Sequence, residues 1–253
     1  MSERPTEVTA LHTRLLRVTL EVESSVAFWS QADPALSHAQ LATQAFEGSW
    51  FGKRSAPRTR KLVDELASRF FPFPQALAVL AGWNDMAPAV KSVVCHWHVQ
   101  LTDAVYRRFS GELLTELRGP EGAVITRPLV ADWIEGLAPG RWSMSTRLKF
   151  SSNLITIGAE AGLIAPSSKE RTMRAPDVPD EALAYLLHLL REIDFEGTLL
   201  DNPYVRSVGL SPDSIDKALQ RLGKRQDQPV EDWMAPSLSQ WFEQFEHRSS
   251  KAP

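Results

Sequence analysis

The chain has 253 residues, of which 43% are hydrophobic and 23% are charged, and its formal net charge is -3 at pH 7. This composition is ordinary for a globular protein and excludes a disordered or strongly basic chain. The one cysteine, Cys95, excludes an internal disulfide and suits a reducing compartment. The acidic start lacks the apolar core of a signal peptide, and no apolar run approaches the roughly 20 residues of a bilayer-spanning helix, so we expect a soluble, cytoplasmic protein that does not contact the membrane.

Helical periodicity dominates the first part of the chain. Hydrophobic residues three and four positions apart predict a single helix over residues 11–29, which the pair Asp33 and Pro34 terminates. A second helix is expected from an N-cap at Ser37 to residue 46.

The next predicted helix is amphipathic and basic. It is expected over residues 55–71, with Pro57 in the first turn, where a missing N–H does no harm. Apolar side chains cover one side of this helix. Three basic side chains cluster on another side and are expected to form an outer basic face: Arg58, Lys61 and Arg69.

Two further helices complete a predicted N-terminal bundle. A short helix follows the Phe-Pro-Phe-Pro turn at residues 71–74 and ends at Leu80, and a long helix is expected over residues 87–117. Glycine and proline between residues 119 and 122 end this long helix. Residues 1–122 are therefore predicted to form one helical domain.

The following stretch has a different order of elements. A helix over residues 127–137 and a tight turn precede a second helix, which Ser143 or Ser145 caps and which reaches residue 157. A short apolar strand at residues 163–164 and a basic loop over residues 166–174 come next. This is the order of elements in a winged helix-turn-helix.

Three more helices are expected after two prolines at 176 and 179, over residues 181–193, 211–222 and 238–245. Residues 123–253 are therefore predicted to form a second helical domain that resembles a helix-turn-helix protein. The predicted fold class is mainly α, with few short strands.

Charge is segregated along the chain, although its total is close to zero. Residues 53–69 hold six basic and two acidic residues, and residues 141–174 also hold six and two. Residues 177–201 hold seven acids and one arginine. Lysine and arginine gathered in this way neutralise phosphate groups without reading base sequence, so the two basic windows predict a nucleic-acid-binding surface.

Residues typical of catalysis or metal binding form no recognisable motif. The closest group is Cys95, His96 and His98, but a zinc site needs three or four ligands and the other histidines are scattered. Packing beside Trp97 on an apolar helix is the favoured interpretation. We therefore expect a protein that is not an enzyme and holds neither metal nor cofactor.

Most of the eight tryptophans fall on apolar helical stripes and are predicted to lie in the core. Trp50 and Trp142 are the exceptions, since each is expected in a loop beside a basic window. A partly exposed aromatic ring in such a place can stack on a base.

Several stretches of the sequence resemble one protein family. The run Trp50–Phe70, with an aromatic residue, a Lys-Arg-Ser step and an arginine-rich helix, resembles the BrxA family of BREX bacteriophage-exclusion systems. Similarity continues at Leu101–Asp103, at Trp142–Leu154 with its Trp-Ser-x-Ser-Thr-x-x-Lys order, and at Ala161–Ile164. The resemblance covers about residues 11–233 and rests on scattered positions.

The resemblance implies a small, non-enzymatic BREX component, mainly α, partly like the NusB antitermination fold, that binds double-stranded DNA. It would act beside the methyltransferase, ATPase and phosphatase-like proteins of the system. A first set of DNA contacts carried over by position is Lys53, Arg54, Arg58, Arg60 and Lys61. A second set is Ser145, Thr146, Arg147 and Lys149, to which the second basic window adds Arg141, Arg171 and Arg174.

Two alternatives remain open at this point. The acidic stretch beside basic windows also suits a scaffold that docks other BREX proteins, and the antitermination likeness also suits RNA binding. Self-association into a homo-oligomer is a further expectation. Each of these predicts partners other than duplex DNA.

Overall fold

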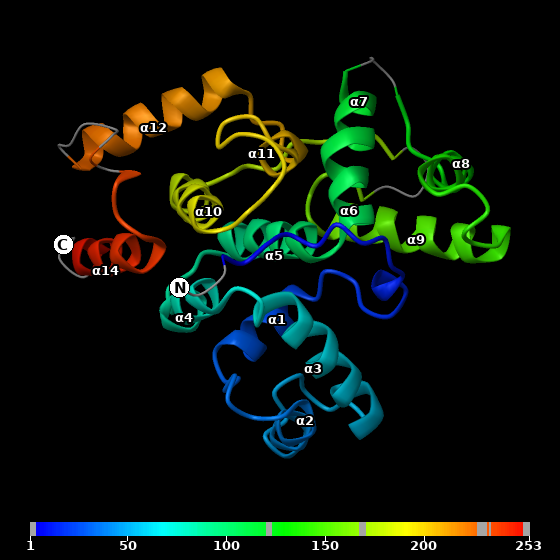
Figure 1. Cartoon of the computed structure of the whole chain (residues 1–253), viewed down its shortest axis with the longest axis horizontal. Helices are drawn as coiled ribbons and strands as arrows, with labels where there is room; N and C mark the ends of the chain where they lie inside the picture. Colours follow the sequence, from blue (N-terminus) through cyan, green and yellow to red (C-terminus); the bar gives the residue numbers. More distant parts are fainter. Residues whose placement is uncertain (1–3, 120–122, 167–170, 227–231, 233, 250–253) are drawn as a thin grey trace.

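The computed structural model describes residues 4–119, 123–166, 171–226, 232 and 234–249. The fold is mainly α, as predicted, and Figure 1 shows its helices around the central helix α5. One short 3-10 helix, η1, and one π-helical turn, η2, occur among the α-helices. In chain order the elements are η1 (Arg14–Leu16), α1 (Val22–Trp29), α2 (His38–Glu47), α3 (Ala56–Phe70), α4 (Pro74–Gly82), α5 (Pro88–Thr102), α6 (Ala104–Arg108), η2 (Phe109–Leu113), α7 (Leu114–Arg118), α8 (Arg127–Leu137), α9 (Met144–Glu160), α10 (Asp180–Glu192), α11 (Pro203–Ser207), α12 (Pro212–Gln226) and α14 (Leu238–Ser249).

Several helices begin where a side chain can cap them. Ser37 accepts a hydrogen bond from the backbone N–H of Gln40, whose own side chain accepts from Ser37 N, so α2 starts with a complete capping box. Ser143 accepts from Thr146 N in the same way at the start of α9. The start at Ser37 was predicted, and of the two candidate caps Ser143 and Ser145 the structure selects Ser143, because a cap is a signal within a few residues of sequence.

The prediction of one helix over residues 11–29 was wrong. Regular helix begins only at Val22, and residues 11–21 form an irregular segment that contains η1. Glu21 has a left-handed backbone (φ 52°), which separates this segment from α1. The apolar side chains Leu15 and Val18 are buried as expected, but the backbone that carries them takes its hydrogen-bond partners from other helices, as described below.

The prediction of one long helix over residues 87–117 was also wrong. Helix α5 ends at Thr102 because Asp103 has an extended backbone (φ -138°, ψ 104°). The Asp103 carboxylate accepts a hydrogen bond from Tyr106 N at 2.9 Å and so caps α6. The chain is then helical again through η2 and α7 to Arg118, so the prediction missed only the interruption at Asp103.

One buried hydrophobic cluster holds the helices together. Helix α5 packs against α1, α3 and α10, α2 packs against α3, and α14 packs against α4 and α10. Trp97, near the middle of α5, is fully buried and donates its indole N–H to Tyr204 O at 3.2 Å. The cluster includes residues on both sides of position 122, where the sequence predicted a domain boundary.

Helices α8 and α9 pack against each other and are accompanied by three short extended pieces of chain. Antiparallel bridges join Val124 to Thr172 and Ile164 to Met173, and Ala165 N donates to Thr172 O at 2.9 Å. Extended segment, α8, α9 and two further extended segments follow one another in the order of a winged helix-turn-helix. Residues 167–170, the tip of the predicted basic loop, lie outside the described residues.

Membrane-spanning segments were not expected. Within the described ranges, none of the helices combines the length and the apolar character that crossing a bilayer requires.

Two glycines allow a matched test of this packing. A Cβ on Gly111, in η2, would lie 2.7 Å from the Cβ and 2.9 Å from the backbone of Pro203, whereas a Cβ on Gly136, in α8, would meet nothing within 4 Å. We expect Gly111→Ala to lower the free energy of unfolding by about 1–3 kcal/mol through overpacking. Gly136→Ala should raise it by about 0.5 kcal/mol through helix propensity. Urea unfolding of both variants checks this, and equal effects would contradict the close η2–α11 contact.

Candidate nucleic-acid interface

The cluster of Cys95, His96 and His98 belongs to the core. All three side chains are fully buried, and both nitrogens of His96 have partners, the Tyr106 hydroxyl and the Ser207 hydroxyl, each at 2.8 Å. Burial raises the pKa of Cys95 to about 12, so its thiol stays protonated near neutral pH. Among the described residues no group of three or more potential ligands could hold a metal ion.

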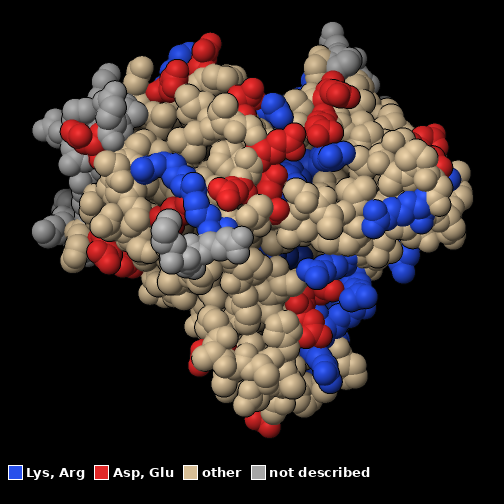
Figure 2. All heavy atoms as spheres, in the orientation of Figure 1, with Lys and Arg blue, Asp and Glu red and all other residues tan. Residues whose placement is uncertain are grey.

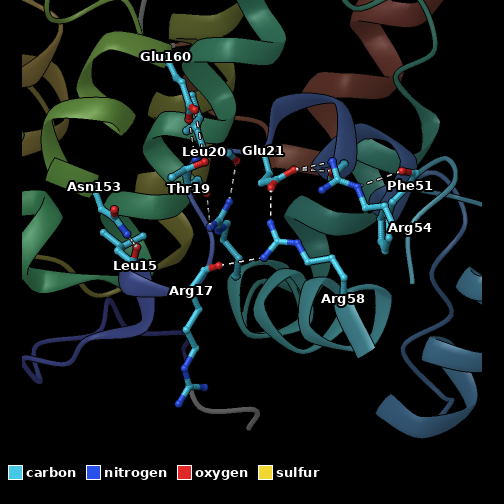
Figure 3. Close-up of polar contacts among 12 residues, drawn as sticks. Leu15, Arg17, Thr19, Leu20, Glu21, Phe51, Arg54, Arg58, Asn153 and Glu160 are labelled. Atoms are coloured by element: carbon cyan, nitrogen blue, oxygen red, sulfur yellow. Dashed lines mark hydrogen bonds and ion pairs between the residues drawn. The ribbon is translucent and has the colours of Figure 1, made fainter. Parts of the chain in front are cut away.

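The irregular segment of residues 11–21 lies between α3 and α9, as Figure 3 shows. On the α9 side, Asn153 Nδ2 donates to Leu15 O at 2.7 Å, and Leu20 N donates to the Glu160 carboxylate at 3.0 Å. On the α3 side, Arg58 donates to Arg17 O at 3.1 Å. The segment therefore joins two helices that are far apart in the sequence.

Arg69 is the most deeply buried of these side-chain donors, which corrects the prediction that it belongs to an outer basic face. Its side chain is 5% exposed and donates to Leu20 O at 2.8 Å and to Thr19 O at 3.0 Å. Burial lowers the pKa of this guanidinium, while the nearby Cys95 and Glu65 raise it. The arginine is thus an internal support of the segment and does not face solvent.

The first predicted set of contacts divides between exposed and paired side chains. Lys53 and Lys61 are exposed. Arg54 and Arg58 both bind the Glu21 carboxylate, with N–O distances of 3.5 Å and 2.9 Å, and each keeps about a third of its side chain exposed. Their charge is therefore partly neutralised before any phosphate arrives.

Arg60 is separated from the other members of this set. It follows Arg58 by two residues, so it points to nearly the opposite side of α3. On that side Asp64, one turn further along, lies 3.1 Å from His38 of α2. Arg60 is exposed but faces the α2 side of the helix.

The second predicted set also divides. Ser145 and Lys149 are exposed on α9, and Thr146 is half-buried. Arg147 turns inward, where its side chain is 15% exposed and lies 2.9 Å from the Glu135 carboxylate of α8. Its position makes it a link between the two helices.

The remaining predicted contacts, Arg141, Arg171 and Arg174, lie before and after α9 in the chain. Arg141 donates to Leu11 O at 2.6 Å and stacks over the Trp142 ring at 5.2 Å from its centroid. Arg171 and Arg174 belong to the extended segment after the basic loop, and Arg171 O accepts from Ile125 N. No described contact brings these last two arginines to α3 or to the irregular segment.

Arg14 and Arg17 are the basic residues that the sequence analysis missed. Both are exposed on the irregular segment, and 63% of the Arg17 side chain is accessible, although it lies 3.5 Å from the Glu65 carboxylate. Their spacing of three residues was the available signal, but the stretch was interpreted as an apolar helical stripe. In the fold they lie between the two predicted sets.

Figure 2 shows Lys and Arg side chains gathered where α3, η1 and α9 meet, with a few acidic side chains among them. The term basic surface is used below for seven exposed or partly exposed cations: Arg14 and Arg17 of the irregular segment, Arg54 just before α3, Arg58 and Lys61 of α3, Arg141 just before α9, and Lys149 of α9. Such a surface can attract and hold a polyanion by neutralising its phosphates.

Comparisons with known proteins give a fold relationship alone. No protein-family model and no curated protein matches the chain. A solved structure, the crystal structure of an uncharacterized protein from Magnetospirillum magneticum, is similar with a TM-score of 0.58 and 14% sequence identity. The match covers 78% of this chain and 97% of that protein.

The buried histidines predict a steep loss of stability in acid. Burial lowers the pKa of His96 and His98 to about 3 and that of His188 to about 4. The unfolded chain binds these protons near the ordinary value of about 6.5. Their contribution is therefore present above about pH 6.5 and decreases as the pH falls, by about 1.4 kcal/mol per pH unit for each group.

His12 acts in the opposite direction. Its hydrogen bond to Asp103 raises its pKa, so its contribution is complete below about pH 6.5 and is lost as the pH rises through the raised value. Urea unfolding at a series of pH values should show stability falling below about pH 6.5. A flat profile in acid would contradict the burial of the three neutral imidazoles.

Proposed function

We propose that this protein binds double-stranded DNA without catalysing a reaction, contacting the phosphate backbone through the basic surface. We further propose that it does so in the cytoplasm as a component of a BREX phage-defence system, which is the family that its sequence resembles. The observation that carries the first proposal is the convergence of cations from α3, α9 and the segment between them on one surface.

The shape of the surface supports a duplex as the ligand. Arg17 and Arg58 lie at the α3 side, linked by the hydrogen bond from Arg58 to Arg17 O, and Arg141 lies at the α9 side, linked to the same segment through Leu11 O. Cations on both sides of the segment can contact phosphates of a duplex, and such contacts fix its position without reading its sequence.

Charge pairing sets the expected strength of this binding. Glu21 already pairs with Arg54 and Arg58, and Glu65 lies beside Arg17. The guanidinium groups stay partly exposed, whereas the Glu21 and Glu65 carboxylates are only 14% and 9% exposed, so a phosphate must compete with carboxylates that already neutralise part of each positive charge. We therefore expect moderate affinity with a strong dependence on salt.

A protein scaffold is the second candidate, because the acidic stretch of residues 177–201 is exposed at several positions. Asp177, Asp194, Glu196 and Asp201 all face solvent, and Asp201 pairs with Arg206 at 2.7 Å. A basic partner protein would fit this side of the molecule. Co-purification of such a partner, with no duplex binding at low salt, would favour the scaffold over DNA binding.

The salt dependence of duplex binding tests the proposal. Replacing Arg14 and Lys61 with alanine removes two exposed cations from the basic surface. The slope of log affinity against log salt concentration should become shallower by about two, since each phosphate contact contributes about 0.9. Fluorescence anisotropy with a random-sequence duplex at several salt concentrations measures this slope.

The matched control replaces Arg108 and Lys217, two exposed cations outside the basic surface, with alanine. It changes the net charge by the same amount and should leave the slope unchanged. Equal slopes for both double variants would show that net charge, and not this surface, governs binding. Preferential binding of duplex RNA in a competition experiment would support the RNA alternative.

A further inference from the structure

Helix α9 presents a polar stripe outward along its length. Ser145, Lys149, Ser152 and Thr156 recur at steps of three and four residues and lie opposite the buried side, which includes Phe150 and Leu154. The carboxylate of Glu160, at the end of this helix, accepts hydrogen bonds from Leu20 N and from the Thr19 hydroxyl. The first turns of α9 therefore carry a cation and small hydroxyls outward.

Met144, the first residue of α9, lies about 100° around the helix from Ser145, beside this polar stripe and not on it. Its side chain is 53% exposed, and among the described residues only Phe46 and Val124 are other large apolar side chains in the exposed class. Its chain neighbours Trp142 and Arg141 stack on each other, with Arg141 also bound to Leu11 O. An apolar side chain thus projects beside a cation of the basic surface without packing in the core.

Met144 lies at the start of α9, the second helix of the pair for which the sequence predicts a helix-turn-helix. The second helix of this motif enters the major groove, and residues near its N-terminus contact the base edges. A helix with side chains is about 10–12 Å wide, which fits the major groove of about 12 Å and not the minor groove of about 6 Å. The thymine methyl group is the apolar feature that bases present in the major groove.

We infer that α9 enters the major groove and that Met144 packs against thymine methyl groups, so that the protein prefers thymine-containing duplexes. The inference rests on the proposed function and deepens it, since the basic surface alone gives no sequence preference. Arg141 and Arg17 would hold the flanking phosphates and thereby set the depth at which Met144 meets the bases.

The experiment compares two duplexes that differ only in this methyl group. The first alternates thymine and guanine on one strand, with the complementary cytosine and adenine on the other, and the second has uracil in place of every thymine. Removing a buried methyl group costs about 0.8 kcal/mol, so we expect the full-length protein to bind the uracil duplex about three- to four-fold more weakly. Anisotropy titrations at one fixed salt concentration give both affinities.

Variants assign this difference to one side chain. Met144→Ala should bind both duplexes equally, and Met144→Leu, which keeps an apolar side chain, should retain the preference. Phe46→Ala removes another exposed apolar side chain, on α2, and should also retain it. Because both side chains are exposed, circular dichroism should be unchanged in all three variants.

The outcomes separate the inference from the function on which it rests. Equal binding of the thymine and uracil duplexes by the unmodified protein, with a steep salt dependence, would overturn the inference and leave phosphate-contacting DNA binding in place. A thymine preference that survives in Met144→Ala would also overturn it. Failure to bind either duplex at low salt would overturn the proposed function and the inference together.

Discussion

The fold depends on supplying hydrogen-bond partners to an irregular piece of chain that is held between two helices. Residues 11–21 have few partners within the segment itself, and burying unpaired carbonyl groups is costly. Long side chains meet the need: Arg69 binds Thr19 O and Leu20 O, and Asn153 binds Leu15 O. Through these contacts α3 and α9 are held on either side of the segment, and their cations reach a common surface.

Because several arginines are bound inside the protein, the arginine content overstates the number of cations available to an external anion. A count along the sequence treats each cation as available to an external anion, whereas Arg69 is buried and Arg147 is bound to Glu135. Arg58 and Arg141 are shared, because each donates to a carbonyl of the segment while part of its guanidinium stays accessible. Arginine suits this shared use because its planar group carries five donors.

Local signals in the sequence were sufficient for much of the fold. The cap at Ser37 was predicted correctly, and the cap of α9 was narrowed to Ser143 or Ser145, because a capped helix start lies within four residues of sequence. The irregular backbone before Val22 was not predicted, because its partners are distant in sequence. The break at Asp103 has a local signal, the hydrogen bond from Tyr106 N to the Asp103 carboxylate, which the apolar spacing across residues 87–117 masked. The apolar spacing at Leu15 and Val18 correctly indicated burial but not the backbone conformation.

The candidate surface was predictable in part for the same reason. Basic windows indicated the region around Lys61 and Lys149, both exposed, since charge density is a property of composition. Which cations meet in space depends on tertiary contacts, so the role of Arg17 between the two sets and the separation of Arg60 from them could not be predicted. Helical spacing alone did not distinguish the buried Arg69 from the exposed Lys61, since the acceptors of Arg69 are carbonyls about 50 residues away.

The contacts of the irregular segment also impose an order of events during synthesis. Leu11, Leu15 and Leu20 bind side chains that follow them in the chain by 130, 138 and 140 residues. At about 5–20 residues per second, a ribosome needs about 7–28 s to make that length of chain. Until then the segment has left the ribosome without its partners, and the two groups of cations have no common support. The surface that we propose for DNA is therefore completed late, so a nascent chain cannot hold a duplex across it.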